Sequence, residues 1–90
     1  MTDQVTFRNC GGEIAYDDKP QAVMPRNADR VGAYVANLNG GPLHLFFGEG
    51  VEIQPFKAVL LPVGYQGPVT ITGKYTDRFQ AVEFSRDTLK

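Results

Sequence analysis

The fold is decided by a seven-residue stretch near the C-terminus, Val69-Thr70-Ile71-Thr72-Gly73-Lys74-Tyr75. Apolar and polar residues alternate in it, so that Val69, Ile71 and Tyr75 fall on one face and the threonines and Lys74 fall on the other. A period of two is typical of a β-strand with one face against a core and the other face in water. We therefore expect a strand here, with Ile71 buried.

Similar short apolar runs recur along the whole chain, separated by clusters of Gly, Pro, Asn and Asp such as residues 39–42 and 66–68. Turn signals spaced by about eight to twelve residues are typical of an all-β sandwich or barrel. Further strands are expected at residues 5–8, 43–47, 57–61 and 78–84. In residues 43–47, Leu43, Leu45 and Phe47 alternate with His44 and Phe46. We expect a compact antiparallel β-sandwich of about seven or eight short strands.

Residues 29–38 leave two interpretations open. Apolar residues at helical spacing favour a helix, and these are Val31, Tyr34, Val35 and Leu38. Gly32 inside the segment and the hairpin signal Asn39-Gly40-Gly41 after it favour a strand. On the residues alone, the strand is the preferred interpretation.

In the last expected strand, residues 78–84, it is open which side chains point toward the core. Strict alternation places Phe79 and Phe84 on opposite faces. A β-bulge near Ala81-Val82 would turn both rings toward the core.

Composition excludes several classes of protein. The chain has 90 residues, of which 42% are hydrophobic and 21% charged, as in an ordinary single globular domain spanning residues 1–90. The net charge is −1 and the basic residues are scattered, so nothing indicates nucleic-acid binding. The longest apolar run is about five residues, far short of a membrane span, and the polar start does not resemble a signal peptide. The single cysteine rules out an internal disulfide and favours a reducing compartment.

Residues capable of catalysis are few. His44 is the only histidine and Cys10 is the only cysteine, and the latter lies in a glycine-rich turn. The carboxylate pairs Asp17-Asp18 and Glu49/Glu52 lack the spacing of a calcium loop. We therefore expect no catalytic residue, no metal site and no cofactor, and we do not expect an enzyme.

Apolar residues exceed what one inner face of a small sandwich needs, and several lie near loops. Exposed aromatic residues at loops usually mark contacts with partners, although such residues also plug the ends of sandwiches. The candidate interface consists of His44, Phe46, Phe56 and Tyr65.

A series of motifs between Pro25 and Ser85 resembles a small β domain found in bacteriophage structural proteins. The series starts with Pro25-Arg26-Asn27-Ala28-Asp29-Arg30 and a strand ending in Val35-Ala36-Asn37. It continues with Leu43-His44-Leu45-Phe46-Phe47-Gly48, Leu60-Leu61-Pro62-Val63-Gly64, Tyr65-Gln66-Gly67-Pro68-Val69 and a late glutamate in Val82-Glu83-Phe84. The resemblance covers about two thirds of the chain, residues 25–85, and is carried by the order and spacing of these elements.

This resemblance implies a jelly-roll-like sandwich in which residues 29–38 form a strand. It implies a virion structural protein assembled in the host cytoplasm, foremost a capsid decoration or cement protein that bridges subunits of the major capsid protein, often as a trimer. Neck, tail, baseplate or fibre modules are the alternative, and a carbohydrate-binding domain is a more distant one. Residues 1–24 lie outside the pattern, and we expect them to form an N-terminal arm or extra strands. Neither nucleic acid nor membrane is expected as a partner.

Overall fold

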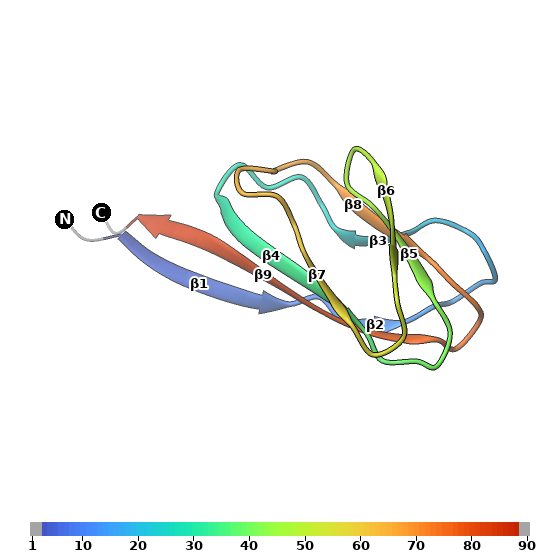
Figure 1. Ribbon diagram of the computed structural model, residues 1–90. Helices are drawn as coiled ribbons and strands as arrows, with labels where there is room; N and C mark the ends of the chain where they lie inside the picture. The colour runs from blue at the N-terminus through green and yellow to red at the C-terminus, as the bar shows by residue number, and fades with distance from the viewer. Residues whose placement is uncertain (1–2, 89–90) are drawn as a thin grey trace.

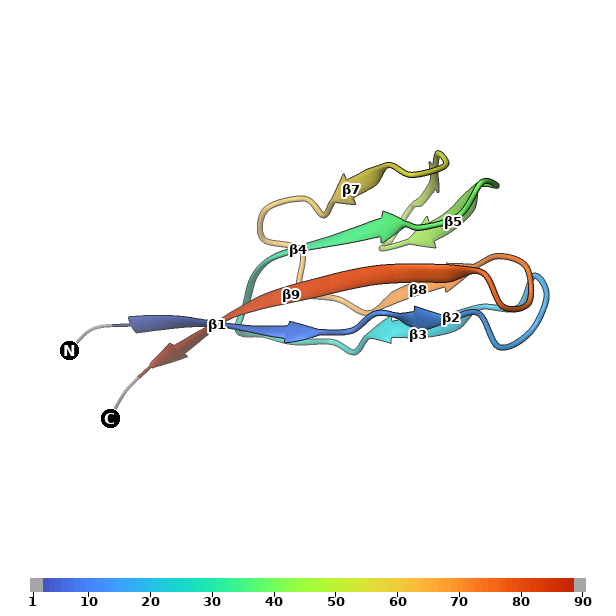
Figure 2. The same cartoon turned by 90° about the horizontal axis from the view of Figure 1, so that it is seen from below.

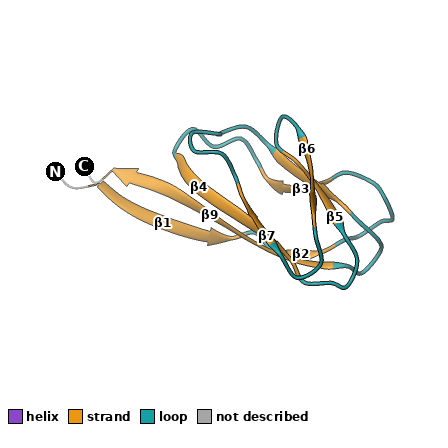
Figure 3. Cartoon of the chain, in the orientation of Figure 1, coloured by secondary structure: helices purple, strands orange, loops and turns teal. Residues whose placement is uncertain are grey.

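Nine strands make up the regular structure in the computed structural model, which describes residues 3–88 (Figures 1 and 3). Their bounds are β1 Asp3–Asn9, β2 Gly12–Glu13, β3 Gln21–Met24, β4 Arg30–Asn37, β5 Leu43–Phe46, β6 Gly50–Ile53, β7 Ala58–Leu60, β8 Val69–Thr72 and β9 Arg78–Thr88. No helix that could cross a membrane occurs in this part of the chain.

The strands form two antiparallel sheets. Sheet A has the order β1-β9-β4-β7, with β2 pairing β9 next to β1, and sheet B has the order β3-β8-β5-β6. The all-β antiparallel sandwich predicted from the sequence is confirmed. The described residues contain more strands than the seven or eight expected, and the strands at positions where none was named are β2, β3 and β6.

Period-two alternation builds the core between the sheets. Leu43 and Leu45 of β5 and Val69 and Ile71 of β8 are fully buried, and Phe47 follows them inward. The prediction for Tyr75 was wrong, since this residue is 64% exposed. Strand β8 ends at Thr72, and the chain turns away before it reaches Tyr75.

Residues 30–37 form a strand, as the sequence favoured. In β4 the buried residues Ala33, Val35 and Asn37 alternate with the less buried Gly32, Tyr34 and Ala36. A helix would have buried Val31 and Leu38 instead, and both are exposed. Pairing with β9 and β7 on either side therefore overrides the helical spacing.

The bulge considered near Ala81-Val82 is absent from the pairing of β9 with β4. Strand β9 pairs with β4 in unbroken register from Phe84 to Phe79, and the only register shift between these two strands lies at Arg30/Gly32. Phe79 is buried in the core, and Phe84 lies on the opposite face of sheet A. The two rings therefore follow strict alternation, and the alternative in which a bulge turns both of them inward does not apply.

Strands β1 and β9 extend beyond the sandwich as a two-stranded ribbon (Figures 1 and 2). Strand β4 pairs with β9 only as far as Ser85, whereas β1 accompanies β9 to Thr88. The ribbon contributes to an elongated molecule with extents of 45, 21 and 19 Å. We call this β1–β9 segment the ribbon.

Candidate interaction surface

Apolar residues form cross-strand rows on the face of sheet A that points away from the core. In one row Leu60 of β7 lies opposite Tyr34 of β4, which lies opposite Val82 of β9. In the next row Phe84 of β9 lies between Gly32 of β4 and Phe7 of β1. Further along the ribbon, Val5 continues the face that Phe7 begins, because residues two apart on a strand share a face. We call this set the outer apolar surface, and it comprises Val5, Phe7, Tyr34, Leu60, Val82 and Phe84.

Much of this surface is open to solvent. The exposed fractions are 62% for Val5, 75% for Phe7 and 79% for Leu60. A groove of about 360 Å³ runs between the side chains of Phe7, Asn9, Tyr34, Gln80, Val82 and Phe84. Single exposed apolar residues are ordinary on a protein surface, but contiguous apolar patches mark sites of interaction.

Gly32 lies opposite Phe84 on this face. A Cβ atom at this position would lie 4.0 Å from Cδ2 of Phe84, which is an ordinary van der Waals contact. The position is partly buried in the middle of the outer face. A side chain here would therefore contact the ring.

An ion cluster lies at the base of the ribbon, in which Arg30 and Glu83 are buried and the Arg8 side chain is 58% exposed. Glu83 is 2% exposed, and its carboxylate accepts a hydrogen bond from Nε of Arg30 at 2.8 Å and another from Nη2 of Arg8 at 2.8 Å. Contact with the Cys10 thiol, together with the negative charge of Glu83, raises the pKa of the Arg8 guanidinium. Arg8 therefore stays positively charged beside the carboxylate at neutral pH.

Arg30 also connects β9 to two loops. Its Nη1 donates to the carbonyl oxygens of Gly67 at 2.8 Å and Tyr65 at 3.3 Å, and its Nη2 donates to that of Pro25 at 2.7 Å. Among the described residues, no buried side-chain polar atom lacks a hydrogen-bond partner. The cluster thus holds strands β4 and β9 and the two loops together at the end of the sandwich where the ribbon begins.

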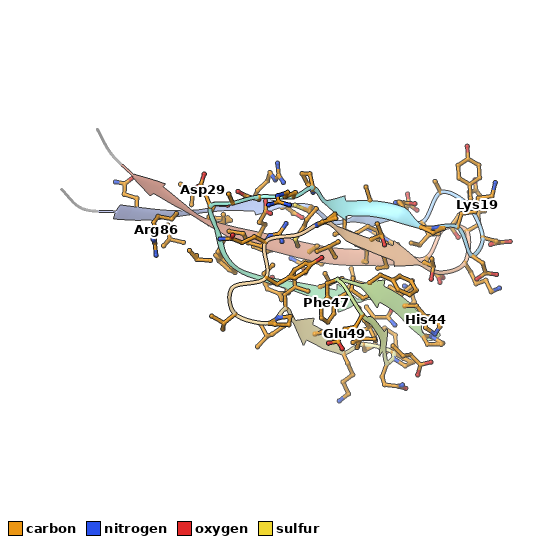
Figure 4. All side chains as sticks on the ribbon, turned by 90° about the horizontal axis from the view of Figure 1, so that it is seen from above. Lys19, Asp29, His44, Phe47, Glu49 and Arg86 are labelled. Atoms are coloured by element: carbon orange, nitrogen blue, oxygen red, sulfur yellow. The ribbon has the colours of Figure 1, made fainter. Side chains whose placement is uncertain are left out.

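Two residues of the candidate interface from the sequence share one face of sheet B. His44 and Phe46 of β5 point to solvent, and Nε2 of His44 lies 3.5 Å from Oε1 of Glu52 on β6. Phe46 is 41% exposed. Figure 4 shows His44 at the end of the molecule away from Arg86 and the ribbon.

The other two residues of that set lie in loops. Phe56 is 72% exposed in the turn between β6 and β7, where it adopts a φ of 58°. Tyr65 packs against the core, with its ring in edge-to-face contact with Phe47 at 5.9 Å, and its hydroxyl donates to the carbonyl of Pro68 at 2.6 Å. The structure therefore groups His44 with Phe46 but gives Tyr65 a packing role. A joint interface of all four residues stays a prediction.

Sequence reasoning missed the outer apolar surface. The signal was present in the alternation of Val5 and Phe7 with Thr6 and Arg8, and in the spacing of Val82 and Phe84. A bulge in β9 would have turned Phe84 inward, so considering such a bulge drew attention away from an apolar outer face.

The two side chains best suited to catalysis, those of Cys10 and His44, are associated with different sheets in the described part of the chain. Cys10 follows β1 and its backbone N–H donates to Ala81 of sheet A, whereas the exposed His44 belongs to sheet B. No group of three or more His, Cys, Asp or Glu residues suited to a metal ion occurs among residues 3–88.

Comparison with known proteins identifies a similar fold. No protein-family model matches the chain, and no curated protein matches it significantly. A solved structure is similar over the full chain and over 93% of its own length, with a TM-score of 0.65 and 15% sequence identity. Its description reads "Bacillus endospore appendages form a novel family of disulfide-linked pili". At this level of identity the similarity concerns the fold, and it agrees with the sandwich described above.

Proposed function

We propose that this protein is a non-catalytic structural subunit that joins other subunits in a larger assembly through the outer apolar surface. The observation that carries the proposal is the pair of apolar rows that cross sheet A, Leu60–Tyr34–Val82 and Phe84–Phe7. Leu60 and Phe7, one residue of each row, are both more than two-thirds exposed, whereas Val82 is 9% exposed.

The energetic reason is burial of apolar area. Covering one large apolar side chain stabilises a complex by about 1.5–3 kcal/mol before the cost of association is counted. In a symmetric assembly the same contact recurs in every subunit, so modest contacts add up through multivalency. A surface of this kind therefore suits a subunit that is present in many copies.

An extracellular appendage is the first candidate for the assembly. It is supported by the similar structure, which is described as a Bacillus endospore appendage belonging to a family of disulfide-linked pili. The present sequence has one cysteine, so these 90 residues cannot join a neighbour on each side through separate disulfides. We therefore propose that its contacts with neighbouring subunits are non-covalent.

A virion is the second candidate, in the form of a trimeric decoration or cement protein on the major capsid protein. Its support is the sequence resemblance between Pro25 and Ser85. Two residues of that resemblance, Arg30 and Glu83, form the buried ion pair. The resemblance therefore argues more strongly for the shared fold than for a capsid-binding site.

The test compares two lysine substitutions at exposed apolar residues. Leu60→Lys lies in the outer apolar surface, and Val63→Lys, at a residue 96% exposed in the following loop, lies outside it. Self-association is measured by sedimentation velocity and electron microscopy, and binding to empty phage heads by co-sedimentation. We expect association of the parent and of Val63→Lys, and weakened association of Leu60→Lys with an unchanged melting temperature. A parent that neither self-associates nor binds heads, or a Leu60→Lys variant that associates like the parent, would contradict the proposal.

A further inference from the structure

Strand β1 is the open edge of sheet A. In the described part of the chain it pairs with β9 on one side only. Along an edge strand, every second residue directs its backbone N–H and C=O groups outward, which makes the edge a template for another strand.

The other edges are short or interrupted. Strand β7 has three residues, and Pro62 follows it closely. Strand β3 has four residues, a register shift and prolines on both sides, Pro20 and Pro25. Strand β6 has four residues and precedes Pro55. Strand β1 has seven residues and no proline, so among these edges it is the least protected against pairing.

The ribbon has little support from the rest of the described structure. Beyond Ser85 no strand other than β1 pairs with β9, and the backbone hydrogen bond from Arg86 to the carbonyl oxygen of Asp29, at 2.7 Å, joins this part to the loop before β4. A two-stranded antiparallel ribbon is marginally stable in water, and about three strands or a packed face are needed for stability. Val5, opposite Arg86, is largely exposed on this two-stranded part, and Phe7, opposite Phe84 at its base, is exposed as well. A third strand beside β1 would supply both backbone partners and side-chain contacts.

We propose that β1 pairs antiparallel with β1 of a second copy of this chain, centred on Thr6. This inference rests on the proposed function and names one partner and one contact for it. With Thr6 opposite Thr6 of the second copy, Val5 lies opposite Phe7 on the outer face and Gln4 lies opposite Arg8 on the other face. Apolar residues thus meet apolar residues, and no like charges are opposed.

Neighbouring registers are less favourable. Centring on Arg8 would set two guanidinium groups directly opposite each other. Centring on Phe7 would place Val5 opposite Asn9, and centring on Val5 would place Phe7 opposite Asp3. Registers shifted by one residue would oppose the apolar face of one copy to the polar face of the other.

The shape of the molecule permits this pairing. The ribbon extends away from the sandwich (Figure 1). When two β1 strands pair antiparallel, the two sandwiches therefore lie at opposite ends of the dimer. The centre becomes a four-stranded sheet in the order β9-β1-β1-β9. Sheet A and its outer apolar surface then continue from one copy into the other.

Disulfide trapping tests the register. Thr6→Cys and, as its matched control, Gln4→Cys are each made in the full chain with Cys10→Ser, so that the introduced cysteine is the only one. In the proposed register the two residues at position 6 are about 5 Å apart between Cα atoms, within disulfide range. The two residues at position 4 are offset by four residues, or about 13 Å, which is out of range. We expect a disulfide dimer from Thr6→Cys and little or none from Gln4→Cys.

Sedimentation of Phe7→Lys, with Val63→Lys as control, provides an independent measurement. We expect the dimer dissociation constant to rise at least about tenfold for Phe7→Lys and to stay nearly unchanged for the control. A chain that stays monomeric, or one that associates with no Thr6→Cys dimer or with equal dimer from Gln4→Cys, would overturn β1 pairing. Association that Leu60→Lys weakens but Phe7→Lys does not would likewise overturn it while leaving the proposed function intact.

Discussion

Arg30 donates a hydrogen bond from Nε to Oε2 of Glu83 at 2.8 Å, and both residues are 2% exposed. The two residues lie 53 positions apart in the sequence, on the adjacent strands β4 and β9. Burial of a charge costs much free energy unless its partner and hydrogen bonds are all in place. Here the carboxylate has two arginine partners and the Arg30 guanidinium reaches three carbonyl groups.

Removing the charge of Glu83 should therefore be severe. We expect Glu83→Gln to lower the free energy of unfolding by about 3 kcal/mol, because it leaves the buried guanidinium of Arg30 without a counter-charge. Urea denaturation measures this change. Glu49→Gln, an exposed residue in the turn after β5, serves as control and should alter stability by less than about 0.5 kcal/mol. Equal stability of the two variants would show that the ion pair does not hold the fold.

The centre of the core gives a second prediction. Ile71→Asp should leave the protein largely unfolded, since it places an unpaired carboxylate at a fully buried position. Ile71→Val keeps the position apolar and should cost about 1 kcal/mol, which stays measurable by thermal denaturation. Thr72→Asp, one residue on and facing the other side of sheet B, is the control. Normal melting of Ile71→Asp would contradict the assigned facing of β8.

A third prediction concerns Gly11, between β1 and β2. A Cβ atom there would lie 2.8 Å from the carbonyl oxygen of Phe79 and 3.0 Å from Cα of Gln80, which are backbone atoms of β9. We expect Gly11→Ala to destabilise the protein by about 1–3 kcal/mol, because these backbone atoms have to move. Gly40→Ala, where a Cβ would contact nothing within 4 Å, should be nearly neutral. Chemical denaturation of both variants measures this difference. Similar denaturation midpoints for Gly11→Ala and Gly40→Ala would argue against close packing of Gly11 on the backbone of β9.

Local pattern was enough to predict part of this fold. The alternation in residues 43–47 and 69–72 correctly assigned the inward side chains, because period-two burial is a property of each strand by itself. Tyr75 was misplaced because the end of β8 depends on the turn at residues 73–77, which packs Gly73 against Leu43.

Features that depend on long-range pairing could not be predicted in the same way. The outer apolar surface combines residues of β1, β4, β7 and β9, which only the strand order of sheet A brings together. The partnership of Arg30 with Glu83 likewise follows from the β4–β9 register, although both residues were noted in the resemblance to phage proteins. Loop aromatics such as Phe56 were visible in the sequence, whereas an apolar face on a sheet looks like core until the sheets are assembled.

Hydroxyl-radical footprinting tests the central claim most directly, because it compares the two candidate surfaces in one experiment. The full chain is oxidised as a monomer at low concentration and in its self-associated or head-bound form. Side-chain oxidation is then quantified by mass spectrometry. We predict that association protects Phe7, Tyr34, Leu60 and Phe84 and leaves Phe46, Phe56 and the exposed Tyr75 unchanged. Protection of Phe46 and Phe56 with continued oxidation of Phe7 and Leu60 would contradict an assembly role for the outer apolar surface.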